Sequence, residues 1–165
     1  MEGEIVNEGS SQGVVAEILI AESAGSKLER LTRARLEKGK GIEGDRYYAK
    51  QGTFSESLIE KGDFEITLIE SEEIAAFNLA AGKNFTSGDF RRNFVTQHIR
   101  LNSLVGKTFY LGSAKLVCTR LCEPCAYLAQ LLGDEVMQYM LHKAGIRAKI
   151  IDSGVVNPQD NIQMC

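Results

Sequence analysis

Three of the four cysteines in the chain fall within eight residues, at Cys118, Cys122 and Cys125; the fourth is Cys165. A thiolate can bind a soft metal, carry a persulfide sulfur or act as a nucleophile. Pro124 is typical of the first position of a helix, so we expect Cys125 at the second position, near unpaired backbone N–H groups. That environment favours the thiolate. The alternative is a structural cysteine packed beneath a helix.

Three residues separate Cys118 from Cys122, and two separate Cys122 from Cys125. The same spacing occurs in radical enzymes, where three cysteines hold an iron–sulfur cluster. Those enzymes place the cluster ahead of a large barrel, and only 40 residues follow Cys125. A closed zinc site needs a fourth ligand, for which Cys165, His98 and His142 are the candidates beyond carboxylates. We therefore treat a bound zinc ion or cluster as a minor alternative, and expect His142 to cap the end of a helix.

Two adjacent arginines, Arg91 and Arg92, precede Asn93 and follow a short polar loop. Paired guanidinium groups with an amide beside them suit a phosphate or another oxyanion. The alternative is a solvated edge with one ion pair.

A second polar segment, GIEGDRY at 41–47, contains Gly44 and Asp45. Its glycines permit close approach of the backbone, and its Asp–Arg pair can orient a ligand. A plain turn with a structural ion pair explains the segment equally well.

Composition excludes several classes of protein. The chain has 165 residues, 44% hydrophobic and 25% charged, which is typical of one globular domain. Nineteen basic against 22 acidic residues give a net charge of −3, which argues against nucleic-acid binding and against an anionic membrane surface. The N-terminus lacks the features of a signal peptide, and no apolar run approaches the ~18 residues of a membrane helix, so we expect a cytoplasmic protein.

Nucleotide-binding motifs are absent from the sequence. Gly106-Lys107-Thr108 ends like a phosphate-binding loop, but Leu101 stands where that motif requires a glycine. Strands outnumber helices and seldom alternate with them, which is unlike a doubly wound parallel sheet. We expect no ATP, NAD or pyridoxal phosphate.

The hydrophobic patterns predict a mostly β (α+β) single domain, with an antiparallel core and a few peripheral helices. Strands are expected at 13–21, 64–70, 94–99, 108–111, 115–120 and 146–151, and helices at 70–81, 123–132 and 134–143. Residues 24–40 are ambiguous, and 50–62 read as an exposed loop. The predicted organisation is a flexible segment at 1–12, a domain at 13–152 and a loosely held tail at 153–165.

Taken in order, several segments resemble the MOSC domain, which is named for the C-terminal domain of molybdenum cofactor sulfurase and also occurs as small bacterial proteins. They are GIEGDRYY, GTFS, FEITLIESEEI, GDFRRNFVT, LNSLVGKTFYLG and LCEPCAYL, and they span roughly residues 14–132. The resemblance implies a β-barrel-like fold and binding of the molybdenum cofactor (molybdopterin).

The resemblance also implies roles for individual residues. Cys125 matches the cysteine that supplies a thiolate to molybdenum, and is thus the candidate catalytic residue and metal ligand. Arg91 and Asn93 match an Arg-x-Asn pattern that holds the pterin phosphate region, with Arg92 in its variable middle. Gly44 and Asp45 match a Gly-Asp segment. At position 47 the chain has Tyr where many members have His.

The implied activity is a molybdenum-dependent reduction of N-hydroxylated compounds. No electron-transfer domain is recognisable in the sequence, so a separate protein is expected to supply the electrons. The alternative is a persulfide sulfur carrier or cofactor-delivery protein without turnover of its own, served by a separate sulfur donor. Cys122 is the alternative functional thiol.

Overall fold

The computed structural model describes residues 13–48 and 65–165. The predicted flexible segment 1–12, the predicted loop 50–62 and Phe64 at the start of a predicted strand lie outside the described residues.

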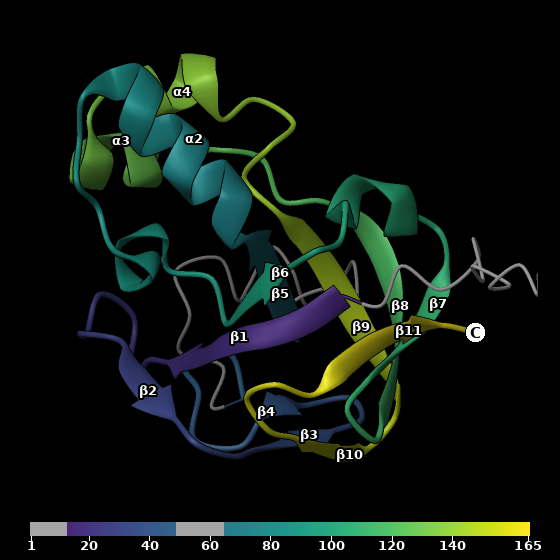
Figure 1. Cartoon of the computed structure of the whole chain (residues 1–165). Coiled ribbons are helices and arrows are strands. Elements are labelled where there is room, and N and C mark those ends of the chain that lie inside the picture. Colours follow the sequence, from purple (N-terminus) through teal and green to yellow (C-terminus); the bar gives the residue numbers. More distant parts are fainter. Residues whose placement is uncertain (1–12, 49–64) are drawn as a thin grey trace, which may run out of the picture.

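A closed β-barrel forms the body of the protein (Figure 1). The described strands of the larger sheet run in the order β11-β7-β8-β9-β5-β6-β1-β2, and β11 also pairs with β1, which closes the ring. The strands in that order are β11 (Asn161–Met164), β7 (Thr108–Leu111), β8 (Ala114–Leu121), β9 (Ile146–Asp152), β5 (Ile66–Glu70), β6 (Phe94–Gln97), β1 (Gly13–Ile20) and β2 (Glu29–Leu31). Of the described pairings in this sheet, only β5 with β6 is parallel. This architecture confirms the predicted mostly β, barrel-like fold.

A second, smaller sheet lies below the barrel in the view of Figure 1. It has the order β10 (Gly154–Val156), β3 (Ala34–Glu37) and β4 (Gly41–Ile42). The ambiguous segment 24–40 thus supplies two strands, β2 and β3, rather than a helix.

The C-terminal residues are part of this architecture, so the prediction that 153–165 form a loosely held tail is wrong. Strand β10 pairs with β3, and β11 pairs with both β7 and β1. Ile162 is 1% exposed in the barrel core. Ile162 stands between Asn161 and Gln163, so the segment lacks the run of β-branched and aromatic residues that marks a strand.

Alternation along the strands creates two apolar cores. Leu68 and Phe94 point into the barrel, while their neighbours Ile69 and Val95 point outward into a second cluster formed with the helices. The barrel therefore has a filled interior and one covered outer face.

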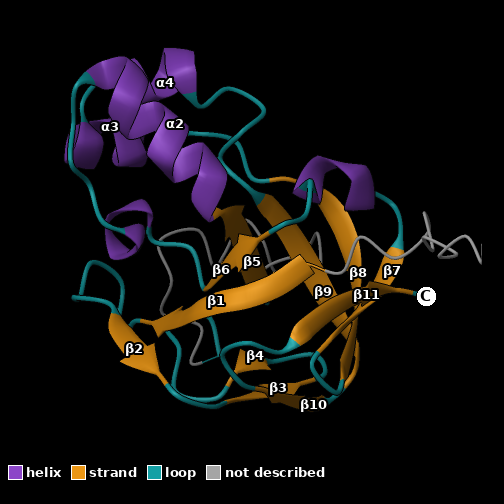
Figure 2. Ribbon diagram, in the orientation of Figure 1, coloured by secondary structure: helices purple, strands orange, loops and turns teal. Residues whose placement is uncertain are grey.

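Three helices cover that face (Figure 2). They are α2 (Ser71–Ala81), α3 (Ala126–Leu132) and α4 (Glu135–Tyr139), and two short 3-10 turns, η1 (Ser87–Phe90) and η2 (Leu101–Leu104), complete the described helical segments. Helix α2 ends as predicted at Gly82, whose φ of 65° is the left-handed conformation that glycine adopts readily.

The other two helices are shorter than predicted. Helix α3 begins at Ala126 rather than at 123, and α4 ends at Tyr139 rather than at 143. A contact joins the two segments left outside the helices: the Glu123 carboxylate accepts a hydrogen bond from the backbone N–H of His142 (2.8 Å) and pairs with its Nδ1 (2.7 Å). His142 therefore lies beyond the helix, at a φ of 62°, and does not cap it.

Two further polar side chains differ from expectation. Glu70, where the predicted strand 64–70 and the predicted helix 70–81 overlap, is the last residue of β5 and is only 5% exposed. Burial raises the pKa of its carboxyl group, and Arg100 lies 3.7 Å away. His98, inside the predicted strand 94–99, lies just past the end of β6 and is exposed.

Candidate functional site

The 41–47 loop is anchored by Asp45. Its Oδ1 accepts hydrogen bonds from the backbone N–H of Ala21 (3.1 Å) and from Arg46 Nη1 (3.2 Å), and its Oδ2 accepts one from the N–H of Tyr47 (3.3 Å). Gly44 has a φ of 90°, and a Cβ there would lie 3.3 Å from Ile20 Cδ1. Asp45 is 1% exposed. Both residues therefore shape the loop rather than present free polar groups.

Arg46 connects this loop to the arginine pair. It is 4% exposed, its Nη2 donates to the backbone carbonyl of Arg91 at 3.1 Å, and its guanidinium lies 4.8 Å from the centre of the Tyr47 ring. The two polar segments singled out in the sequence thus meet through one hydrogen bond.

Arg91 follows η1 and has a left-handed backbone, with a φ of 58°. Its Nη1 donates to the Ser26 carbonyl at 2.9 Å, whereas its Nη2 is buried without an acceptor among the described residues. Burial lowers the pKa of this guanidinium from its ordinary value, and the nearby Arg46 cation lowers it further. An anion placed here would relieve both effects.

Arg92, in contrast, is fully engaged by the protein. Its Nε, Nη1 and Nη2 donate to the carbonyl oxygens of Ala144 (3.0 Å), Phe90 (3.3 Å) and Cys122 (3.4 Å). These bonds tie η1 to the segments before β9 and α3, so Arg92 has a structural function in this part of the fold.

Asn93 joins β1 to β5. Its Oδ1 accepts from the backbone N–H and the hydroxyl of Thr67 (3.2 and 3.1 Å), and its Nδ2 donates to the Leu19 carbonyl at 3.1 Å. The side chain is 0% exposed. It fixes the backbone that carries the arginines, and it does not line the cavity described next.

A small cavity of about 30 Å³ lies where these segments converge. This volume holds about one water molecule. The described residues that line it are mostly cationic or aromatic, with one thiol: Arg46, Tyr47, Thr67, Arg91, Arg92, Cys125, Tyr127, Leu128 and Arg147.

Arg147 is the residue of this cavity that sequence reasoning missed. It is the second residue of β9, opposite Thr67 of β5 and Arg120 of β8, and is 6% exposed. Its Nη1 is buried without an acceptor among the described residues. The available signal was an arginine between Ile146 and Ala148 in a strand we expected to be buried, because buried charges are rare unless they have a partner.

The cysteines occupy different environments. Cys125 is half-buried and lines the cavity. The prediction that it is the second residue of a helix is wrong, because it has an extended backbone and immediately precedes α3, where its carbonyl accepts from the N–H of Ala129 at 3.0 Å. Cys118 lies in the barrel core, where burial raises the pKa of its thiol to about 11. Cys122 is 3% exposed and Cys165 is exposed. Within residues 13–48 and 65–165, no three His, Cys, Asp or Glu side chains are grouped so as to hold a metal ion.

Of the six predicted site residues, the structure therefore brings Cys125, Arg91 and Arg92 to one cavity, and Asn93, Gly44 and Asp45 to the framework behind it. Cys125 and Arg91 are the two with capacity to contact a ligand, and Arg147 joins them. The site is a cationic cavity with one thiol at its wall.

Comparison with known proteins gives a consistent result. The family model of the MOSC domain matches residues 53–163 of the chain. The YuaD protein from Bacillus subtilis has a similar structure, with a TM-score of 0.76 and 19% identity over 92% of this chain and 94% of that one. YiiM from Geobacillus stearothermophilus is similar at a TM-score of 0.68 and 14% identity (93% of this chain, 75% of that one), and YiiM from Escherichia coli at 0.66 and 17% (93% and 68%).

At these identities the structural likeness shows a shared fold. No curated protein sequence matches significantly. The helices of the described residues are all too short or too polar to cross a membrane.

Proposed function

The chain belongs to the MOSC domain family, whose members are associated with the molybdenum cofactor, and we propose that its Cys125 cavity binds that cofactor. One observation carries the proposal. Two buried guanidinium nitrogens, Arg91 Nη2 and Arg147 Nη1, have no acceptor among the described residues, and both side chains line the cavity at Cys125. Buried donors of this kind are costly unless a ligand satisfies them.

The chemistry of the donor set fits the group. The cofactor is anionic and contains a soft metal centre, so guanidinium nitrogens suit its oxygens and a thiolate suits its metal. The cavity of about 30 Å³ is too small for a pterin ring, so it can receive only a small part of the cofactor. The cavity and its donor groups therefore fit an anionic end of the cofactor.

When bound, the cofactor supplies a metal that exchanges electrons with the substrate. Cys125 provides the protein thiolate, and Arg91 and Arg147 donate hydrogen bonds to anionic oxygen. Arg46 holds the Arg91 backbone, and Asp45 holds Arg46.

We propose the reduction of N-hydroxylated compounds as the reaction. The N–O bond breaks, two electrons and two protons are taken up, and an amine or amide and one water are released. The electrons come from a separate donor protein. The support for this reaction is the family resemblance together with the thiol beside the anion cavity.

The size of the cavity favours a second candidate, a persulfide carrier. One added sulfur atom on Cys125 occupies about the volume of one water molecule, and its negative charge would lie beside Arg91 and Arg147. In that reaction the Cys125 thiolate takes the terminal sulfur of a donor persulfide, and the donor leaves as a thiolate.

An anaerobic assay of full-length protein from molybdate-fed cells tests the proposed reaction. Reduced methyl viologen is the electron donor and benzohydroxamic acid the substrate, and benzamide is quantified against viologen oxidised. We expect two viologens consumed per benzamide, with activity lost in Cys125→Ser and kept in Cys165→Ser, whose cysteine is exposed and outside the cavity. Full activity in Cys125→Ser would contradict the proposal. Inactive wild-type protein that carries the mass of one added sulfur on Cys125 would support the persulfide carrier instead.

A further inference from the structure

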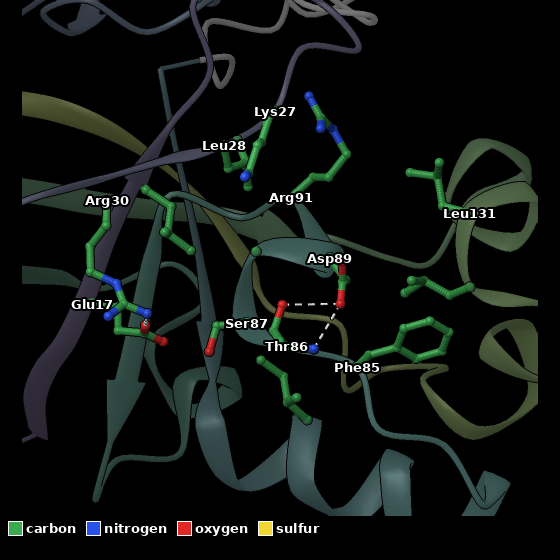
Figure 3. Close-up of a pocket in the computed structure, with 14 residues that line it drawn as sticks. Glu17, Lys27, Leu28, Arg30, Phe85, Thr86, Ser87, Asp89, Arg91 and Leu131 are labelled. Carbon is green, nitrogen blue, oxygen red and sulfur yellow. Dashed lines mark hydrogen bonds and ion pairs between the residues drawn. The ribbon is translucent and has the colours of Figure 1, made fainter.

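A much larger groove adjoins the Cys125 cavity, and Arg91 lines both (Figure 3). Its volume is about 750 Å³, which is within the range of small-molecule sites. The groove lies between the end of β1, the segment leading to β2, η1 and helices α2 and α3. The groove is therefore a second and larger pocket beside the cavity that Cys125 lines.

One end of the groove is apolar. Phe85 and Leu131 lie on the same side of it (Figure 3), and Ile74 and Leu132 also line the groove. Leu131 is 46% exposed, and Phe85 is partly buried against the apolar cluster between the helices and the outer face of the barrel. Such a wall suits an aromatic or aliphatic body, because covering it removes apolar surface from water.

Some of the charged groups that line the groove have partners within the protein, and one has no ion-pair partner. Glu17 is paired with Arg30, and the Asp89 carboxylate accepts hydrogen bonds from the backbone N–H (2.7 Å) and hydroxyl (3.0 Å) of Thr86. Lys27 has no ion-pair partner among the described residues, and its amino group is directed into the groove (Figure 3). The groove thus offers one ammonium group without an ion-pair partner and, in another part, an apolar wall.

We propose that this groove binds an organic anion with an apolar body, such as an arylalkyl carboxylate. The carboxylate contacts Lys27, and the body lies against Phe85 and Leu131. Because Arg91 belongs to both spaces, a ligand held here lies next to the Cys125 cavity. Its role as a substrate rests on the proposed function, but its binding does not require the cofactor.

Two matched probes test the binding: 4-phenylbutyrate, and the neutral 4-phenylbutanamide of the same shape. Dissociation constants are measured by calorimetry on cofactor-free full-length protein, and amide chemical shifts locate the site. We expect the carboxylate to bind about three- to fivefold more tightly than the amide, with the difference reduced by added salt.

Variants with matched controls assign the contacts. Lys27→Gln should abolish the preference for the carboxylate, while Lys83→Gln, an exposed lysine outside the groove, should keep it. Leu131→Asn should weaken both probes several-fold, while Leu141→Asn, an equally exposed leucine outside the groove, should not.

Equal affinity for the two probes, or shifts located away from the groove, would overturn the proposal. So would loss of probe binding in cofactor-loaded protein, because the groove would then belong to the cofactor. Retained probe binding in protein that takes up no molybdenum would mean that the proposed function has failed while the binding site stands.

Discussion

Replacing Arg147 with methionine should make the protein more stable, although it removes a residue of the proposed site. Arg147 is 6% exposed, and its buried Nη1 has no acceptor among the described residues. A buried unsatisfied donor costs about 1–3 kcal/mol. The cavity can hold about one water, which can serve one of the two unpartnered nitrogens, so we take the lower part of that range.

We therefore expect Arg147→Met to raise the free energy of unfolding by about 1 kcal/mol and Tm by about 2–4 °C. Arg92→Met is the matched control, because Arg92 lines the same cavity and is 7% exposed but donates to three carbonyl oxygens. Loss of those bonds should lower the free energy of unfolding by about 3 kcal/mol.

Urea denaturation followed by circular dichroism measures both variants, with the slope of the transition as a check that the unfolded states are comparable. Inorganic phosphate at constant ionic strength should raise Tm of the wild type more than that of Arg147→Met. If Arg147→Met lowers the free energy of unfolding as much as Arg92→Met does, the inference that Arg147 has an unsatisfied donor in the ligand-free protein is refuted.

Three further predictions concern the framework. Asn93→Ala should lower the free energy of unfolding by about 2–4 kcal/mol in urea titrations, because the Thr67 N–H and the Leu19 carbonyl lose their partner; a change near zero would mean that the amide is not structural. Ile162→Ala should cost about 2–4 kcal/mol in the same titrations, because β11 closes the barrel, whereas a neutral effect would agree with a loose tail. At pH 8, iodoacetamide should modify Cys118 far more slowly than Cys165 by mass spectrometry, since burial raises the pKa of Cys118 to about 11 and keeps its thiol protonated; equal rates would contradict its burial.

Strong local patterns made much of the fold predictable. The alternation in 64–70 placed Ile66 and Leu68 on one face, and both point into the barrel core. The acidic first turn and Gly82 marked helix α2. Elements whose limits depend on distant contacts were not predictable in the same way. The Glu123–His142 contact joins residues 19 apart where two helices stop short of their predicted limits, and β11 pairs with β7 and β1, which are distant in the sequence.

The candidate site shows the same division. Residue type and spacing identified Cys125 and Arg91, because a thiol and a guanidinium group are candidate ligand-binding groups in any surroundings. The sequence could not show that the polar atoms of Asn93 and Asp45 bond to the framework. The partners of Asn93 lie in β1 and β5, and the distant partner of Asp45 is Ala21, just after β1. Arg147 was missed because β9 approaches the cysteine segment only in the folded barrel, through its pairing with β8.

The central claim is that Cys125 and the cationic cavity bind the molybdenum cofactor. The most direct test is the molybdenum and pterin content of full-length protein from molybdate-fed cells, measured for the wild type, Cys125→Ser and Cys165→Ser. We expect about one molybdenum and one pterin per chain in the wild type and in Cys165→Ser, with molybdenum lost from Cys125→Ser. Neither component in the wild type, or undiminished molybdenum in Cys125→Ser, would contradict it.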